Sequence, residues 1–203
     1  MTIKRGETWG EPAPLPADGV VVRTDAEARA VVTRARRAGL TPPTLGLLGG
    51  DLCRTLGGLG DEAALRSEGA MTFPCDLGVA ELDGEPHWFV AHAIARRSWW
   101  RGRVVAAMNA QWLGTWDLGP RSHPDDGLLD ITDGTMPFGD RLKARRRLPT
   151  GTHLPHPALT VTRTATADLV LDPSLDIWLD GEKMGRCHRL VLSIDPDALR
   201  VVV

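Results

Sequence analysis

The spacing of the apolar residues changes near Thr72, and this change restricts the folds open to the chain. Before it, apolar residues recur at the helical spacing of 3.6, as over residues 28–35. After it they alternate with the period of two that a half-buried strand shows, as over residues 175–179. We therefore predict an α+β fold, with a small β-α-β layer in residues 1–70 and an antiparallel β-sandwich in residues 71–203.

The N-terminal part carries the signals of one β-α-β unit. Residues 19–22 form a short apolar run typical of a buried strand. Thr24 and Glu27 then match a capping box, which places a helix start at this point, and Gly39 is suited to the helix end. Residues 45–48 read as a second strand. We expect a parallel pair joined by a right-handed crossover.

Gly49-Gly50-Asp51 follows the second predicted strand directly. Two glycines between a strand and a helix can present backbone N–H groups to a phosphate. The same pair also serves as an ordinary strand-to-helix turn. The residues alone leave both interpretations open.

The β-rich part begins with a predicted hairpin. Residues 75–80 and 87–92 each read as one strand, and Asp83-Gly84 between them is a hairpin-turn signal. His87 and His92 would then lie on opposite faces of one strand, which argues against a shared metal.

A turn rich in carboxylates occupies residues 123–130, with the sequence His-Pro-Asp-Asp-Gly-Leu-Leu-Asp. Pro124 and Gly127 indicate a tight turn that brings side-chain and backbone oxygens into a small volume. Magnesium and calcium ions prefer such oxygen ligands. A solvated, purely structural turn is the alternative.

The order of several motifs resembles the C-terminal domain of the diacylglycerol kinase catalytic family, the bacterial lipid kinases that include sphingosine-kinase relatives. The family carries a D-G-x-L-D turn, a helix, a β-rich run, an L-D-G-E element and a closing strand. The corresponding segments here are residues 126–130, the basic segment 141–147, and residues 159–171, 179–182 and 195–203. Residues 51–54 also match the second half of the family's G-T-x-N-D-[FL]-A-R motif.

The resemblance implies roles for particular residues. It assigns the carboxylate that orients or deprotonates a lipid hydroxyl to Asp180 and Glu182. It implies a structural Mg²⁺ at the side chain of Asp126, with backbone oxygens near His123 and Leu128. The nearest string to the family's nucleotide loop, G-G-D-G-T, is Gly49-Gly50-Asp51, but it stands where the later motif belongs.

The missing G-G-D-G-T loop bears on two functional interpretations of the chain. Without it, the resemblance favours a lipid kinase-like protein with a truncated nucleotide-binding part and doubtful ATP binding, a non-catalytic or impaired relative that binds a lipid or a partner. The alternative is an active ATP-dependent kinase of diacylglycerol or sphingosine type, completed by a partner chain. The fold alone does not separate them.

The composition restricts the kinds of partner that the chain is expected to bind. A net charge of −2 argues against a nucleic-acid binder, and no apolar run has the length of a transmembrane helix. Three widely spaced cysteines indicate reduced thiols, so we expect a cytoplasmic protein. The five basic groups in residues 141–147 are either a solvated helix face or a contact for anionic lipid. Four tryptophans in residues 99–116 form a core corner or a surface for an acyl chain or partner; a homodimer is also open.

Overall fold

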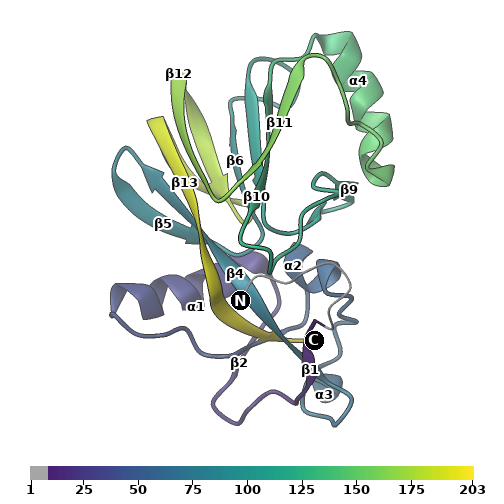
Figure 1. Ribbon diagram of the computed structural model, residues 1–203, viewed down its shortest axis with the longest axis vertical. Coiled ribbons are helices and arrows are strands. Elements are labelled where there is room, and N and C mark those ends of the chain that lie inside the picture. Colours follow the sequence, from purple (N-terminus) through teal and green to yellow (C-terminus); the bar gives the residue numbers. More distant parts are fainter. Residues whose placement is uncertain (1–8) are drawn as a thin grey trace.

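The computed structural model describes residues 9–203, and its N-terminal part contains the predicted β-α-β unit (Figure 1). Strands β2 and β3 pair in parallel, with Val20 opposite Leu45. Helix α1 connects them and covers one side. The elements of this part are β1 (Glu11–Pro12), β2 (Val20–Val22), α1 (Asp25–Arg37), β3 (Leu45–Leu47), α2 (Gly50–Thr55) and α3 (Glu62–Leu65).

The predicted capping box sets the start of α1. The Thr24 hydroxyl accepts the N–H of Glu27 at 3.1 Å, and the Glu27 carboxylate accepts the N–H of Arg23 at 2.6 Å. These bonds satisfy donors that a helix start leaves free. Ala28 and Val32 face the core at 1% and 0% exposure, which confirms the helical spacing in the sequence.

The remaining chain is mostly antiparallel sheet, which confirms the predicted fold class. The main strand order is β1-β4-β13-β12-β6-β7-β10-β11, while β8 and β9 form a separate two-stranded ribbon. The elements are β4 (Met71–Leu82), β5 (Glu85–Phe89), β6 (His92–Arg96), β7 (Val104–Met108), β8 (Trp112–Leu113), β9 (Trp116–Asp117), β10 (Leu129–Gly134), α4 (Phe138–Arg147), the 3₁₀ turn η1 (Leu148–Thr150), β11 (Leu159–Thr164), β12 (Thr166–Leu179) and β13 (Glu182–Val202).

Two long strands connect the two parts of the molecule. β4 and β13 pair along most of their length and run from the upper sheet into the lower part in Figure 1. Their register shifts between Asp195 and Leu199, where Asp197 has a φ of 54°. Beyond this irregularity Val201 pairs in parallel with Leu45 of β3. The small layer is therefore hydrogen-bonded to the large sheet.

One predicted strand is divided in the structure. Residues 87–92 were expected to form one strand, but β5 ends at Phe89 and β6 begins at His92. The backbone N–H groups of residues 90–92 point to the carboxylate of Asp180. His87 and His92 thus lie on different strands. No helix in the described range 9–203 is long and apolar enough to cross a membrane.

Candidate functional site

Asp180 lies in the Asp-Gly turn between β12 and β13, inside the fold rather than on an open rim. Its Oδ1 accepts the N–H groups of Ala91 and His92 at 2.9 and 3.1 Å, and its Oδ2 accepts that of Val90 at 2.9 Å. Asp180 is only 6% exposed. Burial raises the pKa of its carboxyl group, although the charge of His92 and the three N–H donors act in the opposite direction. Through these hydrogen bonds, the carboxylate connects the β5–β6 segment to this turn.

His92 joins this turn to helix α2. Its Nε2 lies 3.1 Å from Oδ2 of Asp51, whose Oδ1 accepts the N–H of Gly114 at 2.8 Å. Burial lowers the pKa of His92, whereas the hydrogen bond to Asp51 and the charges of Asp180, Asp51 and Asp25 raise it; the net direction is upward. A protonated His92 would therefore be surrounded by carboxylates.

Asp25 is a site residue that the sequence analysis missed. Its carboxylate accepts the N–H groups of Asp51 and Leu52, at 2.5 and 3.1 Å, at the start of α2. Burial, followed by the charge of Asp180, raises the pKa of Asp25 to about 6. Gly50 has a φ of 95°, and a Cβ there would lie 2.5 Å from Oδ1 of Asp25, so glycine is required. In the sequence, Asp25 reads only as an acidic residue in the first turn of α1, which hid this role.

The residues predicted for catalysis and phosphate binding divide between two environments. Asp180, Asp51 and the Gly49-Gly50 turn come together around His92 and Asp25. Glu182, the first residue of β13, pairs instead with Arg29 of α1. The Glu182 side chain is 61% exposed and that of Arg29 only 8%. The two acids of Asp180-Gly181-Glu182 therefore have separate partners.

The carboxylate-rich turn is closed by protein groups. Asp126 Oδ1 accepts the N–H of Leu128 at 3.0 Å, and its Oδ2 pairs with Arg163. Asp76 of β4 accepts the N–H of Gly127 at 2.6 Å. His123 accepts the N–H of Asp125 at 3.3 Å, through its Nδ1.

These contacts fit a structural turn better than the predicted metal site. Within residues 9–203, no group of three or more acidic, histidine or cysteine side chains is placed to hold a metal. Both Asp126 oxygens are occupied, and Arg163 adds a positive charge beside them. Oδ1 of Asp125 and Oδ2 of Asp130 are buried without a hydrogen-bond partner among the described residues, so these are the oxygens a cation would meet there. The assignment to Asp126, His123 and Leu128 stays a prediction.

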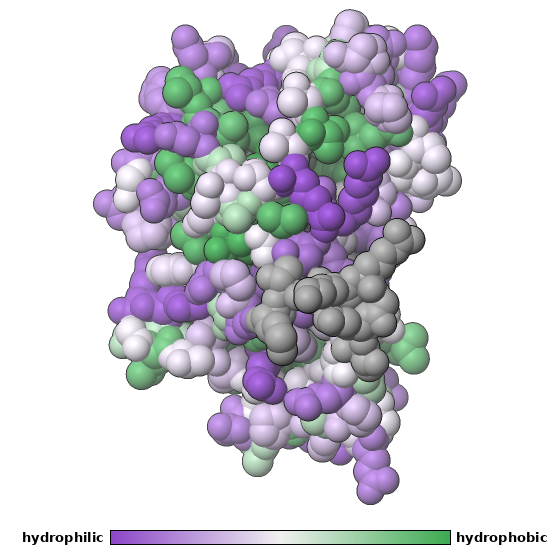
Figure 2. Space-filling view, viewed as in Figure 1, coloured by the Kyte–Doolittle hydropathy of each residue, from purple (hydrophilic) through white to green (hydrophobic). Residues whose placement is uncertain are grey.

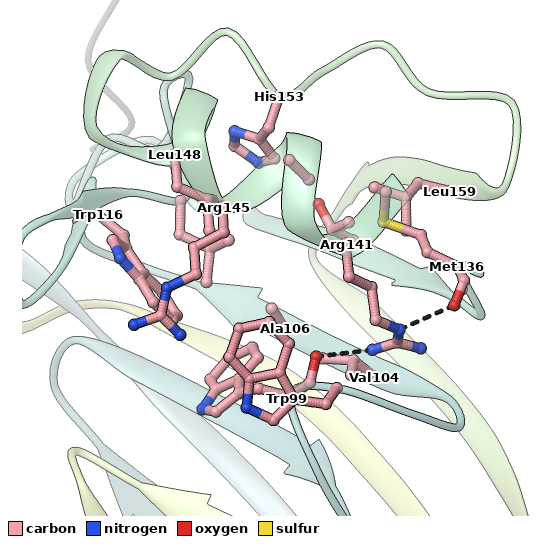
Figure 3. A pocket seen from close by; sticks show the side chains of 15 residues that line it. Trp99, Val104, Ala106, Trp116, Met136, Arg141, Arg145, Leu148, His153 and Leu159 are labelled. Carbon is pink, nitrogen blue, oxygen red and sulfur yellow. Dashed lines mark hydrogen bonds between the residues drawn. The ribbon is translucent and has the colours of Figure 1, made fainter. Parts of the chain in front are cut away.

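An apolar pocket lies between α4 and the sheet, with a volume of about 100 Å³ (Figure 3). Trp99 and Trp116 meet edge to face in its wall, with centroids 5.3 Å apart. A neighbouring cleft of about 470 Å³ shares Trp99, Trp116 and Arg145 with the pocket and reaches His92 and Gly181. The apolar pocket thus lies next to the Asp180 cluster.

Comparison with known proteins identifies the family. The model of the YegS C-terminal NAD kinase beta sandwich-like domain matches residues 73–203. The chain belongs to this family. The lipid-kinase resemblance seen in the motifs is thereby confirmed. No curated protein matches the chain significantly.

Solved structures agree on the fold. A protein of Bacillus anthracis strain Sterne, assigned provisionally as a diacylglycerol kinase, superposes with a TM-score of 0.69 at 15% identity, over 91% of this chain and 77% of that one. A further structure, described as a diacylglycerol kinase of the same organism, gives 0.61 at 14% identity, over 91% and 75%. At such identities the likeness concerns the fold only.

Proposed function

We propose that this YegS-type protein binds a lipid or similar apolar ligand in the pocket under α4 and does not transfer phosphate. The observation that carries the proposal is the Asp25 carboxylate on the N–H groups of Asp51 and Leu52. These N–H groups are the donors that the Gly49-Gly50 turn would offer to a phosphate. A negative side chain already in place both uses the donors and repels a second anion.

The predicted catalytic carboxylates support the same proposal. Asp180 uses both oxygens to bind backbone N–H groups inside the fold, a structural role that competes with taking a proton from a hydroxyl. Glu182 is more accessible, but Arg29 pairs with it. This ion pair engages the carboxylate that a general base would need free.

The pocket supplies the binding half of the proposal. Its wall contains indole rings and aliphatic groups of β7, β9, α4, η1 and β11, including Ala106, Leu148 and Leu159 (Figure 3). Its volume takes a short segment of an aliphatic chain. A longer ligand would continue past Trp100, which lines the pocket and is 40% exposed.

A pair of matched variants tests binding in the pocket. Ala144 of α4 lines the pocket, whereas Leu142 of the same helix does not and is 41% exposed. Ala144→Phe should fill the pocket and lower the affinity for a fluorescent fatty-acid probe at least tenfold. Leu142→Phe should leave that affinity unchanged. Equal probe affinities in both variants and wild type would place the ligand elsewhere.

The active kinase remains the alternative, and the cleft beside His92 and Gly181 favours it, because that cleft adjoins the lipid pocket. Calorimetry with ATP and Mg²⁺, followed by transfer of labelled phosphate to diacylglycerol or sphingosine, separates the two functions. We expect neither binding nor transfer. Transfer that disappears in Glu182→Gln would establish the kinase.

We also propose that the region around α4 contacts anionic membrane. Arg141 is buried, where its guanidinium donates to the carbonyls of Met136 at 2.8 Å and Trp99 at 3.0 Å, so it is not available. The basic groups left exposed on the helix include Lys143, Arg146 and Arg147. Each contributes about 1 kcal/mol near an anionic surface.

Apolar side chains accompany these charges. Phe138 and Leu142 are 65% and 41% exposed, and Phe138 lies 6.0 Å from the ring of Trp100. Figure 2 shows apolar surface gathered on the half of the molecule that holds the large sheet in Figure 1. Co-sedimentation with vesicles containing phosphatidylglycerol should fall several-fold in Phe138→Ser. Wild-type binding that is equally strong to neutral vesicles would contradict the role of the basic residues of α4.

A further inference from the structure

His153 is a buried polar residue of the apolar pocket that has no hydrogen-bond partner among the described residues. The residue is 5% exposed, and neither Nδ1 nor Nε2 has a hydrogen bond among the described residues. It follows η1 and lies beside Leu148, at the end of the pocket opposite Trp99 (Figure 3). The rest of the pocket wall is mostly apolar, and its charged members are Arg141 and Arg145. A buried imidazole in this position loses its contacts with water and gains none from the protein.

Burying such a group without a partner disfavours the folded state, because its hydrogen bonds to water are lost and not replaced. Native proteins satisfy most of their buried polar groups, so an exception requires an explanation. A ligand with a hydrogen-bonding group would supply one. The nearby guanidinium groups have other roles: Arg141 donates to backbone carbonyls, and Arg145 lies over the rings of Trp100 and Trp116 at 4.9 and 5.6 Å.

The protonation state of His153 determines which ligand group suits it. Burial lowers its pKa, with the charge of Asp117 acting in the opposite direction. A neutral imidazole has one N–H donor and one nitrogen acceptor. A hydroxyl group matches this pair because it also donates and accepts. A carboxylate only accepts, so it would leave the acceptor nitrogen of the imidazole without a donor.

We propose that His153 binds the free hydroxyl of the ligand, so that the pocket selects a neutral long-chain alcohol or glyceride over an ether, a hydrocarbon or a fatty acid. This inference rests on the proposed ligand binding under α4. It adds the polar group that the ligand must carry and the residue that recognises it.

The test compares 1-decanol with its methyl ether, 1-methoxydecane, by calorimetry on the full chain. The two ligands fill the same apolar space, but only the alcohol donates a hydrogen bond. Wild type should bind the alcohol about tenfold more tightly, the ratio expected for one buried hydrogen bond. Decanoate and 1-monodecanoylglycerol extend the series to an anion and a glyceride.

Two variants separate recognition from folding. His153→Phe should remove the preference for the alcohol while the ether still binds. His156→Phe changes a histidine of the same loop that does not line the pocket and pairs with Asp140 at 3.9 Å, so the preference should persist. If His153→Phe does not fold, His153→Gln retains a donor and an acceptor and should keep a reduced preference.

The outcomes are distinguishable. A wild type that binds alcohol and ether equally overturns the role of His153 and leaves ligand binding intact. A preference that survives in His153→Phe does the same. A wild type that binds no member of the series overturns the proposed function and this inference with it.

Discussion

Replacing Asp180 by asparagine should destabilise the protein, because the carboxylate holds the chain together. The amide oxygen of asparagine can keep the two N–H bonds that Oδ1 now accepts from Ala91 and His92. The amide nitrogen, however, would face the N–H of Val90, a donor opposite a donor. The variant loses one hydrogen bond to a charged acceptor, about 1.5–3 kcal/mol, and weakens the others.

Removing the buried charge partly offsets this loss, since the carboxylate is desolvated and lies near Asp25. We expect a net decrease of about 2–4 kcal/mol in the free energy of unfolding. For a chain of this length, that corresponds to a melting temperature lower by roughly 5–15 °C.

Urea unfolding followed by tryptophan fluorescence and circular dichroism measures the change. Asp168→Asn is the control at an exposed carboxylate of β12. Its side chain is 52% exposed and its partner Arg189 is 63% exposed, so the stability should stay close to that of wild type. An Asp180→Asn protein as stable as wild type would refute the structural role, since a purely catalytic acid tolerates this change without loss of stability.

Three further predictions concern neighbouring residues. The pKa of Asp25 rises from 3.8 to about 6 on folding, so the folded chain binds this proton more tightly than the unfolded chain. The free energy of unfolding should therefore fall as the pH increases from about 4 to 6. Urea titrations at several pH values should show a smaller decrease in Asp25→Asn. Gly50→Ala should destabilise more than Gly57→Ala in thermal unfolding, because both have positive φ but only the Cβ at 50 meets Asp25. Millimolar Mg²⁺ should shift the melting temperatures of wild type and Asp126→Ala equally, because the Leu128 N–H and Arg163 already engage the Asp126 carboxylate; a shift confined to wild type would instead establish a cation at the turn.

The sequence by itself determined the elements that depend on local signals. Thr24 and Glu27 fixed the start of α1, and the alternation over residues 175–179 fixed which side chains enter the core, with Leu175, Ile177 and Leu179 at 3% exposure or less. The Asp83-Gly84 turn and the helix after Pro137 follow from the same kind of signal. Each depends on neighbours along the chain, so the pattern is visible without the fold.

Only the tertiary structure decided which partners the polar groups find. Asp25 meets the start of α2, 26 positions away, and Asp180 meets Val90, 90 positions away. The division of residues 87–92 into two strands also follows from that distant carboxylate. Periodicity carries no information about such contacts, because they depend on how the long strands β4 and β13 bring the small layer against the sheet. For the same physical reason, a histidine in a loop, His153, became a candidate ligand contact only when the pocket around it was known.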